Sequence, residues 1–122
     1  MVFHDIHAAW AWFVVIGNGA AGAWSLGAHV RPSLRTRWLW IATAIVQASV
    51  FVQTLLGVAA YQEEHLQPDA VDFHILYGAT ALLSVGVLYG YRHQLADKLH
   101  LLYGLGGLWI MGLGIRAMVL HL

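Results

Sequence analysis

Residues 38–61 read WLWIATAIVQASVFVQTLLGVAAY, a stretch without one charged side chain. A helix needs about 20 consecutive apolar residues to cross the hydrocarbon core of a membrane, and this stretch is long enough to do so. Lipid offers no partners to backbone N–H and C=O groups, so a segment that crosses it must satisfy them within itself. The stretch therefore predicts a membrane-spanning α-helix.

Three further apolar stretches have a similar character. They cover residues 7–29, 73–91 and 99–122, and the last contains Arg116. Of the 122 residues, 60% are hydrophobic and 10% are charged, whereas a soluble domain usually carries about 25% charged residues. The length suits one domain. We therefore expect residues 1–122 to form a single all-α domain, a polytopic bundle of four transmembrane helices.

The three connections between these stretches differ in charge. Arg31, Arg35 and Arg37 follow the first stretch, and Arg92 and Lys98 follow the third. The middle connection holds only acidic charges: Glu63, Glu64, Asp69 and Asp72. Basic residues in short loops are retained on the cytoplasmic side, so the first and third connections should lie inside. Both termini should then lie outside. We expect the membrane to be a bacterial-type inner membrane or a plasma membrane.

Each expected helix has one face of polar or small side chains, because residues three or four positions apart lie on the same side of a helix. The face on the first stretch comprises His7, Ala11, Val14, Asn18, Gly22, Ser25 and His29. The second has Thr43, Gln47, Val50 and Thr54, and the third has His74, Tyr77, Ala81, Ser84 and Leu88. The fourth has His100, Tyr103, Gly107, Met111, Gly114, Met118 and His121. Such faces should meet inside the bundle, where small residues let helices approach closely.

A short repeat suggests an internal duplication. The sequence Asp5-Ile6-His7 opens the first stretch, and Asp72-Phe73-His74 opens the third. Each is followed by a helix, a basic connection and a second helix. The two halves could therefore be related by a pseudo-twofold axis along the membrane normal.

The eight histidines lie near the ends of the expected spans. Neutral imidazole is the commonest metal ligand and an axial ligand of haem. His7 and His74 form the best pair for haem b, because both begin a span at the outer side and lie on inward faces. Arg116 is the candidate partner for an anionic group at that level. A second set of candidate ligands lies at the inner side: His29 with His93 or His100.

The outer histidines also fit a divalent metal. The candidate ligands are His4, His7, His65, His74 and His121. Together with the carboxylates of the middle connection they suit Zn²⁺ or Cu²⁺. The simpler interpretation is that these histidines are amphipathic side chains at a wet boundary, like the Trp and Tyr residues near them.

Several function classes are disfavoured by what the sequence lacks. It has no cysteine, which removes disulfides, Fe–S clusters and cysteine-ligated zinc. Its formal net charge is zero, so it carries no electrostatic footprint for nucleic acid. Small proton-coupled drug exchangers require an acidic residue deep within a span, and this sequence has no Asp or Glu at such a position. No nucleophile–base arrangement or phosphate loop is recognisable, so we do not expect an enzyme.

Two function classes remain, with a weaker third. The first is a non-enzymatic accessory or structural subunit that packs in the lipid bilayer against other membrane subunits or copies of itself. The second is an electron-transfer protein that binds haem or a metal through the histidines named above. The third is an oligomeric transporter or channel, because four helices of this length enclose little space by themselves.

Overall fold

The computed structural model describes residues 2–64 and 68–121. Over these residues the chain has no strand and forms four α-helices: α1 (Val2–Val30), α2 (Arg37–Glu64), α3 (Pro68–Gly90) and α4 (Leu99–His121). Two short 3-10 helices lie in the connections: η1 (Pro32–Leu34) and η2 (Ala96–Lys98). The expected all-α fold with four helices is confirmed.

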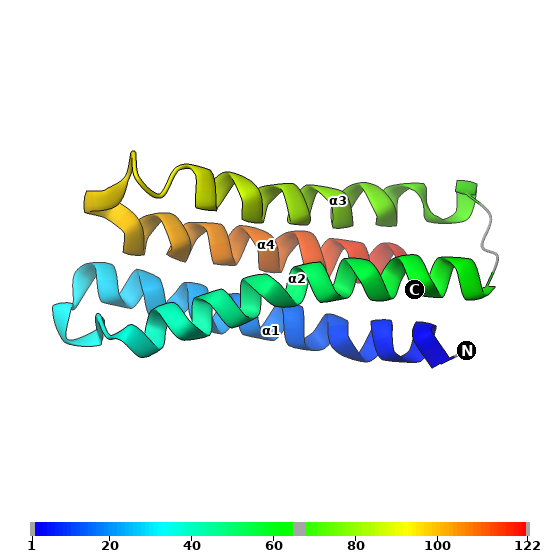
Figure 1. The fold of residues 1–122 in the computed structure, drawn as a ribbon, viewed down its shortest axis with the longest axis horizontal. Helices are drawn as coiled ribbons and strands as arrows, with labels where there is room; N and C mark the ends of the chain where they lie inside the picture. The colour runs from blue at the N-terminus through cyan, green and yellow to red at the C-terminus, as the bar shows by residue number, and fades with distance from the viewer. Residues whose placement is uncertain (1, 65–67, 122) are drawn as a thin grey trace.

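The four helices run antiparallel to one another in chain order (Figure 1). Both termini lie at the end of the bundle where α2 finishes and α3 begins, and η1 and η2 lie at the opposite end. We call the latter the basic end, because it carries five of the six basic residues: Arg31, Arg35, Arg37, Arg92 and Lys98. The former is called the terminal end. The helix order thus gathers most of the basic residues at one end of the long axis.

The closest helix contact joins α1 to α4 through glycine. A Cβ atom placed on Gly107 would lie 2.9 Å from the backbone oxygen of Asn18 and 2.9 Å from the Cα of Gly22. One placed on Gly22 would lie 2.9 Å from the backbone oxygen of Gly104. The two backbones touch directly, so these positions have no room for a side chain. This is the close approach that small residues permit between membrane helices.

The helices do not contact one another equally. α1 packs extensively against α4 and α2, and α3 packs against α4, whereas α2 and α3 make few contacts. A pseudo-twofold axis relating α1 to α3 and α2 to α4 would make the α1–α4 and α2–α3 contacts equivalent. One is the most extensive in the bundle and the other is sparse, so the expected internal symmetry is not obeyed.

Polar side chains lie inside the bundle. Asn18 is 1% exposed and donates through Nδ2 to the backbone oxygens of Val14, at 2.9 Å, and Val46 in α2, at 3.3 Å. Ser25 is fully buried, and its hydroxyl donates to the backbone oxygen of His100 in α4 at 2.7 Å. The predicted inward face of α1 is therefore confirmed at Asn18 and Ser25. That of α2 is confirmed at Thr43 and Gln47, which are also buried.

The predicted inward face of the fourth helix is shifted. Ile110, Leu113 and Ala117 are buried there, while Met111 and Met118 are only half-buried. The physical reason is that α4 lies between α1 and α3 and therefore needs two inward faces. Gly104, Gly107 and Gly114 face α1. The buried apolar residues of α4 join a core cluster with members from all four helices: Val14, Val50, Ala81, Val85, Leu88, Ile110 and Leu113.

Two segments of the described chain are long and apolar enough to cross a membrane, residues 37–60 and 96–119. The described apolar part of α3, residues 75–90, is shorter, and α1 is not among the segments that meet this criterion. α1 is long enough, with 29 residues, but glycine, tryptophan and Asn18 dilute its apolar character. By length and composition, two helices of the described chain could therefore cross a membrane, whereas the sequence predicts four.

Candidate functional site

At the terminal end, His7 of α1 is directed at α2. A Cβ atom on Gly57 would lie 3.0 Å from Cε1 of its imidazole, so the ring rests on the bare backbone of α2. The backbone oxygen of His7 accepts a hydrogen bond of 3.0 Å from Nε2 of Gln53. His74 lies in the first part of α3 at the same end, but its side chain is outside the described residues. The structure therefore describes the side chain of His7, one of the two proposed haem ligands, but not that of His74.

The proposed metal set falls largely outside the described side chains. Of its five members His7 has a described side chain, and the others do not: His4, His65, His74 and His121. Among the side chains that are described, no three histidine, aspartate or glutamate residues lie close enough to hold a metal ion.

Arg116 is exposed on α4. Its guanidinium carbon lies 6.0 Å from the centre of the Tyr77 ring in α3, within the range of a cation–π contact. The charge therefore sits at the surface of the terminal end rather than in the bundle interior.

At the basic end, the three inner histidines have different surroundings. The His100 ring packs 4.9 Å from Trp40, and its buried Nε2 has no hydrogen-bond partner among the described residues. His29, at the end of α1, is half-buried and close enough to His100 for the two imidazoles to interact electrostatically. His93 is exposed beyond the end of α3. The structure thus packs His100 against Trp40, within electrostatic range of His29, whereas His93 is exposed.

A groove that was not predicted from the sequence lies between α2 and α3, where helix packing is sparse. It has two adjoining parts of about 380 and 370 Å³, which share Ala44, Gln47 and Tyr89. The part at the basic end is also lined by Trp40, Thr43, Arg92, His93, Ala96, Leu99 and Tyr103. The part nearer the middle of the bundle is also lined by Ala48, Phe51, Val85 and Gly86. We call the whole the α2–α3 groove.

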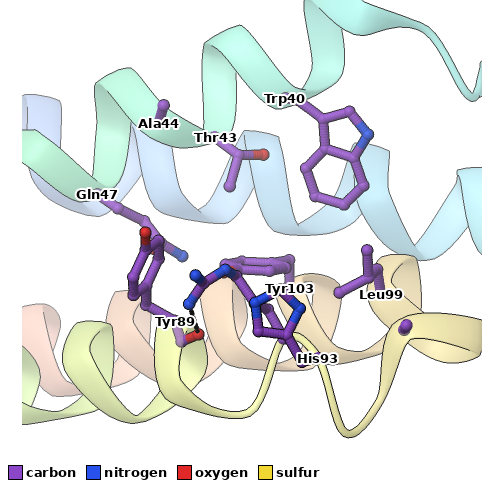
Figure 2. Close-up of a pocket in the computed structure, with 10 residues that line it drawn as sticks. Trp40, Thr43, Ala44, Gln47, Tyr89, His93, Leu99 and Tyr103 are labelled. Atoms are coloured by element: carbon purple, nitrogen blue, oxygen red, sulfur yellow. Dashed lines mark hydrogen bonds between the residues drawn. The ribbon is translucent and has the colours of Figure 1, made fainter.

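Figure 2 shows the part of this groove at the basic end, with side chains of α2 facing those of α3, α4 and their connection. Trp40 meets Tyr103 edge to face, with ring centres 5.6 Å apart. Arg92 folds back over Tyr89, with its guanidinium carbon 3.6 Å from the ring centre and Nη1 donating to the Tyr89 backbone oxygen at 2.7 Å. This part of the groove is therefore lined by aromatic rings, and the guanidinium of Arg92 lies at its end against Tyr89.

Thr43 gives this wall an unsatisfied polar group. The side chain is 6% exposed, and its buried hydroxyl has no hydrogen-bond partner in the described part of the chain. A threonine inside a helix usually bonds back to a carbonyl of the preceding turn, as Thr54 does to Val50 at 2.9 Å. An unpaired hydroxyl in such a place costs free energy, which a bound polar group would recover.

The sequence contained a weak signal for this groove. Trp40, Thr43 and Gln47 share one face of α2, and Tyr89 precedes Arg92 by three residues. Neither pattern shows that the two lie opposite each other, because that depends on the loose packing of α2 against α3.

Protein-family models, curated proteins and solved structures were compared with the chain, and none of them matches it. The function is therefore inferred from the residues of this chain alone.

Proposed function

We propose that the chain is an integral membrane protein whose four helices all cross the bilayer, with the basic end in the cytoplasm. The supporting observation is the outer surface, which is apolar around every helix. One large side chain from each helix illustrates it: Ile16 63% exposed, Leu55 70%, Leu83 70% and Trp109 57%. Polar residues such as Asn18 and Ser25 are buried instead. A helix that is hydrophobic on all sides belongs in a protein core or a membrane.

Cysteine labelling tests this location, because the chain has no cysteine of its own. With a membrane-impermeant maleimide, Val2→Cys should react in intact cells, and Gln94→Cys should react only after the membrane is permeabilised. Ile45→Cys, at a position 54% exposed in the middle of α2, should stay unlabelled in both cases because lipid covers it. Labelling at position 45 would contradict the membrane location, and the reverse order at positions 2 and 94 would contradict the orientation.

Within this location, the role that the features support best is that of a non-enzymatic accessory subunit. Its described interior contains a cluster of packed apolar side chains contributed by all four helices. On the outside, Gly78 of α3 has open space where a Cβ would lie. Such a bare position accommodates a helix of another subunit, since close backbone approach is a main source of helix association in lipid.

A second candidate function is haem b binding at the terminal end, through His7 and His74. It is favoured by the orientation of His7, whose imidazole is turned onto Gly57 of α2 rather than toward the surroundings. Trp10 and Tyr77 pack against the core one helical turn further in. Haem between the two histidines would therefore require these aromatic rings to move aside.

Native mass and visible absorption of the same preparation distinguish the two roles. A chain extracted from its own host in mild detergent should migrate with a mass well above that of its monomer and show no Soret band. This result is expected even when haem is supplied during expression. A coloured monomer that loses its Soret band in His7→Ala or His74→Ala would instead establish the haem protein and overturn the accessory role.

A further inference from the structure

We propose that the α2–α3 groove binds one anionic phospholipid, with the phosphate at Arg92 and one acyl chain lying between α2 and α3. This proposal rests on the membrane location proposed above and adds a specific ligand to it. The site combines a groove, a cation at one end of it and an unpaired hydroxyl in its wall.

The dimensions of the groove match one leaflet. Along α2 it extends from Trp40 to Phe51, which corresponds to about 16 Å at a helical rise of 1.5 Å per residue. The hydrocarbon core of a bilayer is about 30 Å thick, so one leaflet contributes about 15 Å. The groove thus spans the depth that an acyl chain of the cytoplasmic leaflet occupies.

The lining changes character along this length. Near the middle of the bundle the walls are Ala48, Phe51, Val85 and Gly86, which offer an acyl chain only apolar contacts. Ala48, Phe51 and Gly86 are exposed, so the groove opens sideways to the surrounding lipid. A lipid can therefore enter from the bilayer without the helices separating.

At the basic end the groove is suited to an anion. Arg92 is held in place by Tyr89, and the bond to the Tyr89 backbone uses one of the five N–H donors of a guanidinium. Leu99, the first residue of α4, also lines the groove, and the N-terminus of a helix carries partial positive charge. Basic pockets between helices on the cytoplasmic side are typical sites for anionic headgroups.

The neighbouring charges do not cancel this attraction. Within the described basic end the acidic side chain is Asp97, which does not line the groove and is followed directly by Lys98. The other four basic residues of this end, Arg31, Arg35, Arg37 and Lys98, do not line the groove. Arg92 is therefore the basic side chain that a ligand in the groove would meet.

Native mass spectrometry of the full chain released from nanodiscs tests the proposal. The nanodiscs contain equal amounts of phosphatidylglycerol and phosphatidylcholine. The chain should retain one phosphatidylglycerol about tenfold more often than phosphatidylcholine, the ratio expected from one charge-assisted contact. Arg92→Gln should abolish this preference. Arg37→Gln, which removes an equal charge from the same end outside the groove, should leave it intact.

A second pair of variants tests the acyl-chain part without changing charge. Gly86 and Gly112 both have open space where a Cβ would lie. Gly86→Leu fills the groove and should reduce lipid retention about tenfold, whereas Gly112→Leu, on the outer surface of α4, should not. Excess glycerol phosphate should fail to displace the lipid, because the headgroup alone lacks the apolar contacts.

The proposal is overturned by equal retention of both lipids, by equal effects of Arg92→Gln and Arg37→Gln, or by displacement with glycerol phosphate. A dimer that Gly86→Leu dissociates would also overturn it, because a second copy would then occupy the groove. Any of these results leaves the membrane location untouched, since that location is tested separately by cysteine labelling.

Discussion

Replacing Gly107 by leucine is expected to lower the free energy of unfolding by about 3 kcal/mol or more, at the upper end of overpacking effects. The new side chain would meet the backbone oxygen of Asn18 and the Cα of Gly22, both 2.9 Å from its Cβ position. Backbone atoms inside a helix cannot move aside individually, so α1 and α4 would have to separate along their length. Unfolding by a rising fraction of sodium dodecyl sulfate, followed by tryptophan fluorescence, measures the change.

Gly112→Leu is the matched control for this prediction. The same residue is introduced on the same helix, but no atom lies within 4 Å of the new Cβ. Its effect should remain within about 0.5 kcal/mol, as for substitutions that alter no packing. Equal effects at positions 107 and 112 would mean that α1 and α4 do not touch through their backbones.

Replacing Asn18 by aspartate is expected to lower the free energy of unfolding by about 3–5 kcal/mol, the cost of leaving a buried charge without a partner. The amide nitrogen of Asn18 donates to the backbone oxygens of Val14 and Val46. An ionised carboxylate has no donor, so the two carbonyl oxygens would face a negative charge instead. The site is 1% exposed and water cannot screen this repulsion. The detergent titration used for Gly107 also measures this loss.

Asn18→Leu separates loss of the amide from introduction of charge. Leucine has a similar size, and it removes both donor bonds together with Oδ1, which is buried and lacks a partner among the described residues. Hydrogen bonds between membrane helices average about 0.6 kcal/mol, so the net change should stay below about 1 kcal/mol. If leucine destabilises as much as aspartate, the loss comes from the missing amide hydrogen bonds rather than from the introduced charge.

The sequence predicted the helices well, because their signal is local. Long apolar stretches without charge determine where each helix lies, and the basic connections occur where the chain turns. The small and polar face around Asn18, Gly22 and Ser25 also predicted correctly which side of α1 is buried. On a helix that packs by one face, residue spacing alone identifies that face.

The sequence did not predict the features that depend on how helices are arranged around one another. The burial of Ile110 and Leu113 follows from the position of α4 between two neighbours, which periodicity within α4 does not encode. The α2–α3 groove results from a pair of helices that fail to pack tightly, and its two walls come from separate parts of the chain. The terminal-end ligands stay a prediction, because His74 lies outside the described side chains.

The sparse contact between α2 and α3 also sets the order in which the bundle assembles during synthesis. α4 leaves the ribosome last, yet it supplies the main contact surface of both α1 and α3. Before it arrives, Ser25 has no carbonyl from His100 to bond, and α3 has little to rest against. We therefore expect α1 and α2 to pair first, with Asn18 already bonded to Val46, and α3 to stay loosely attached until α4 completes the bundle. Until then Ser25 and the glycine face of α1 lack their partners on α4, so this intermediate should be the form most accessible to proteolysis.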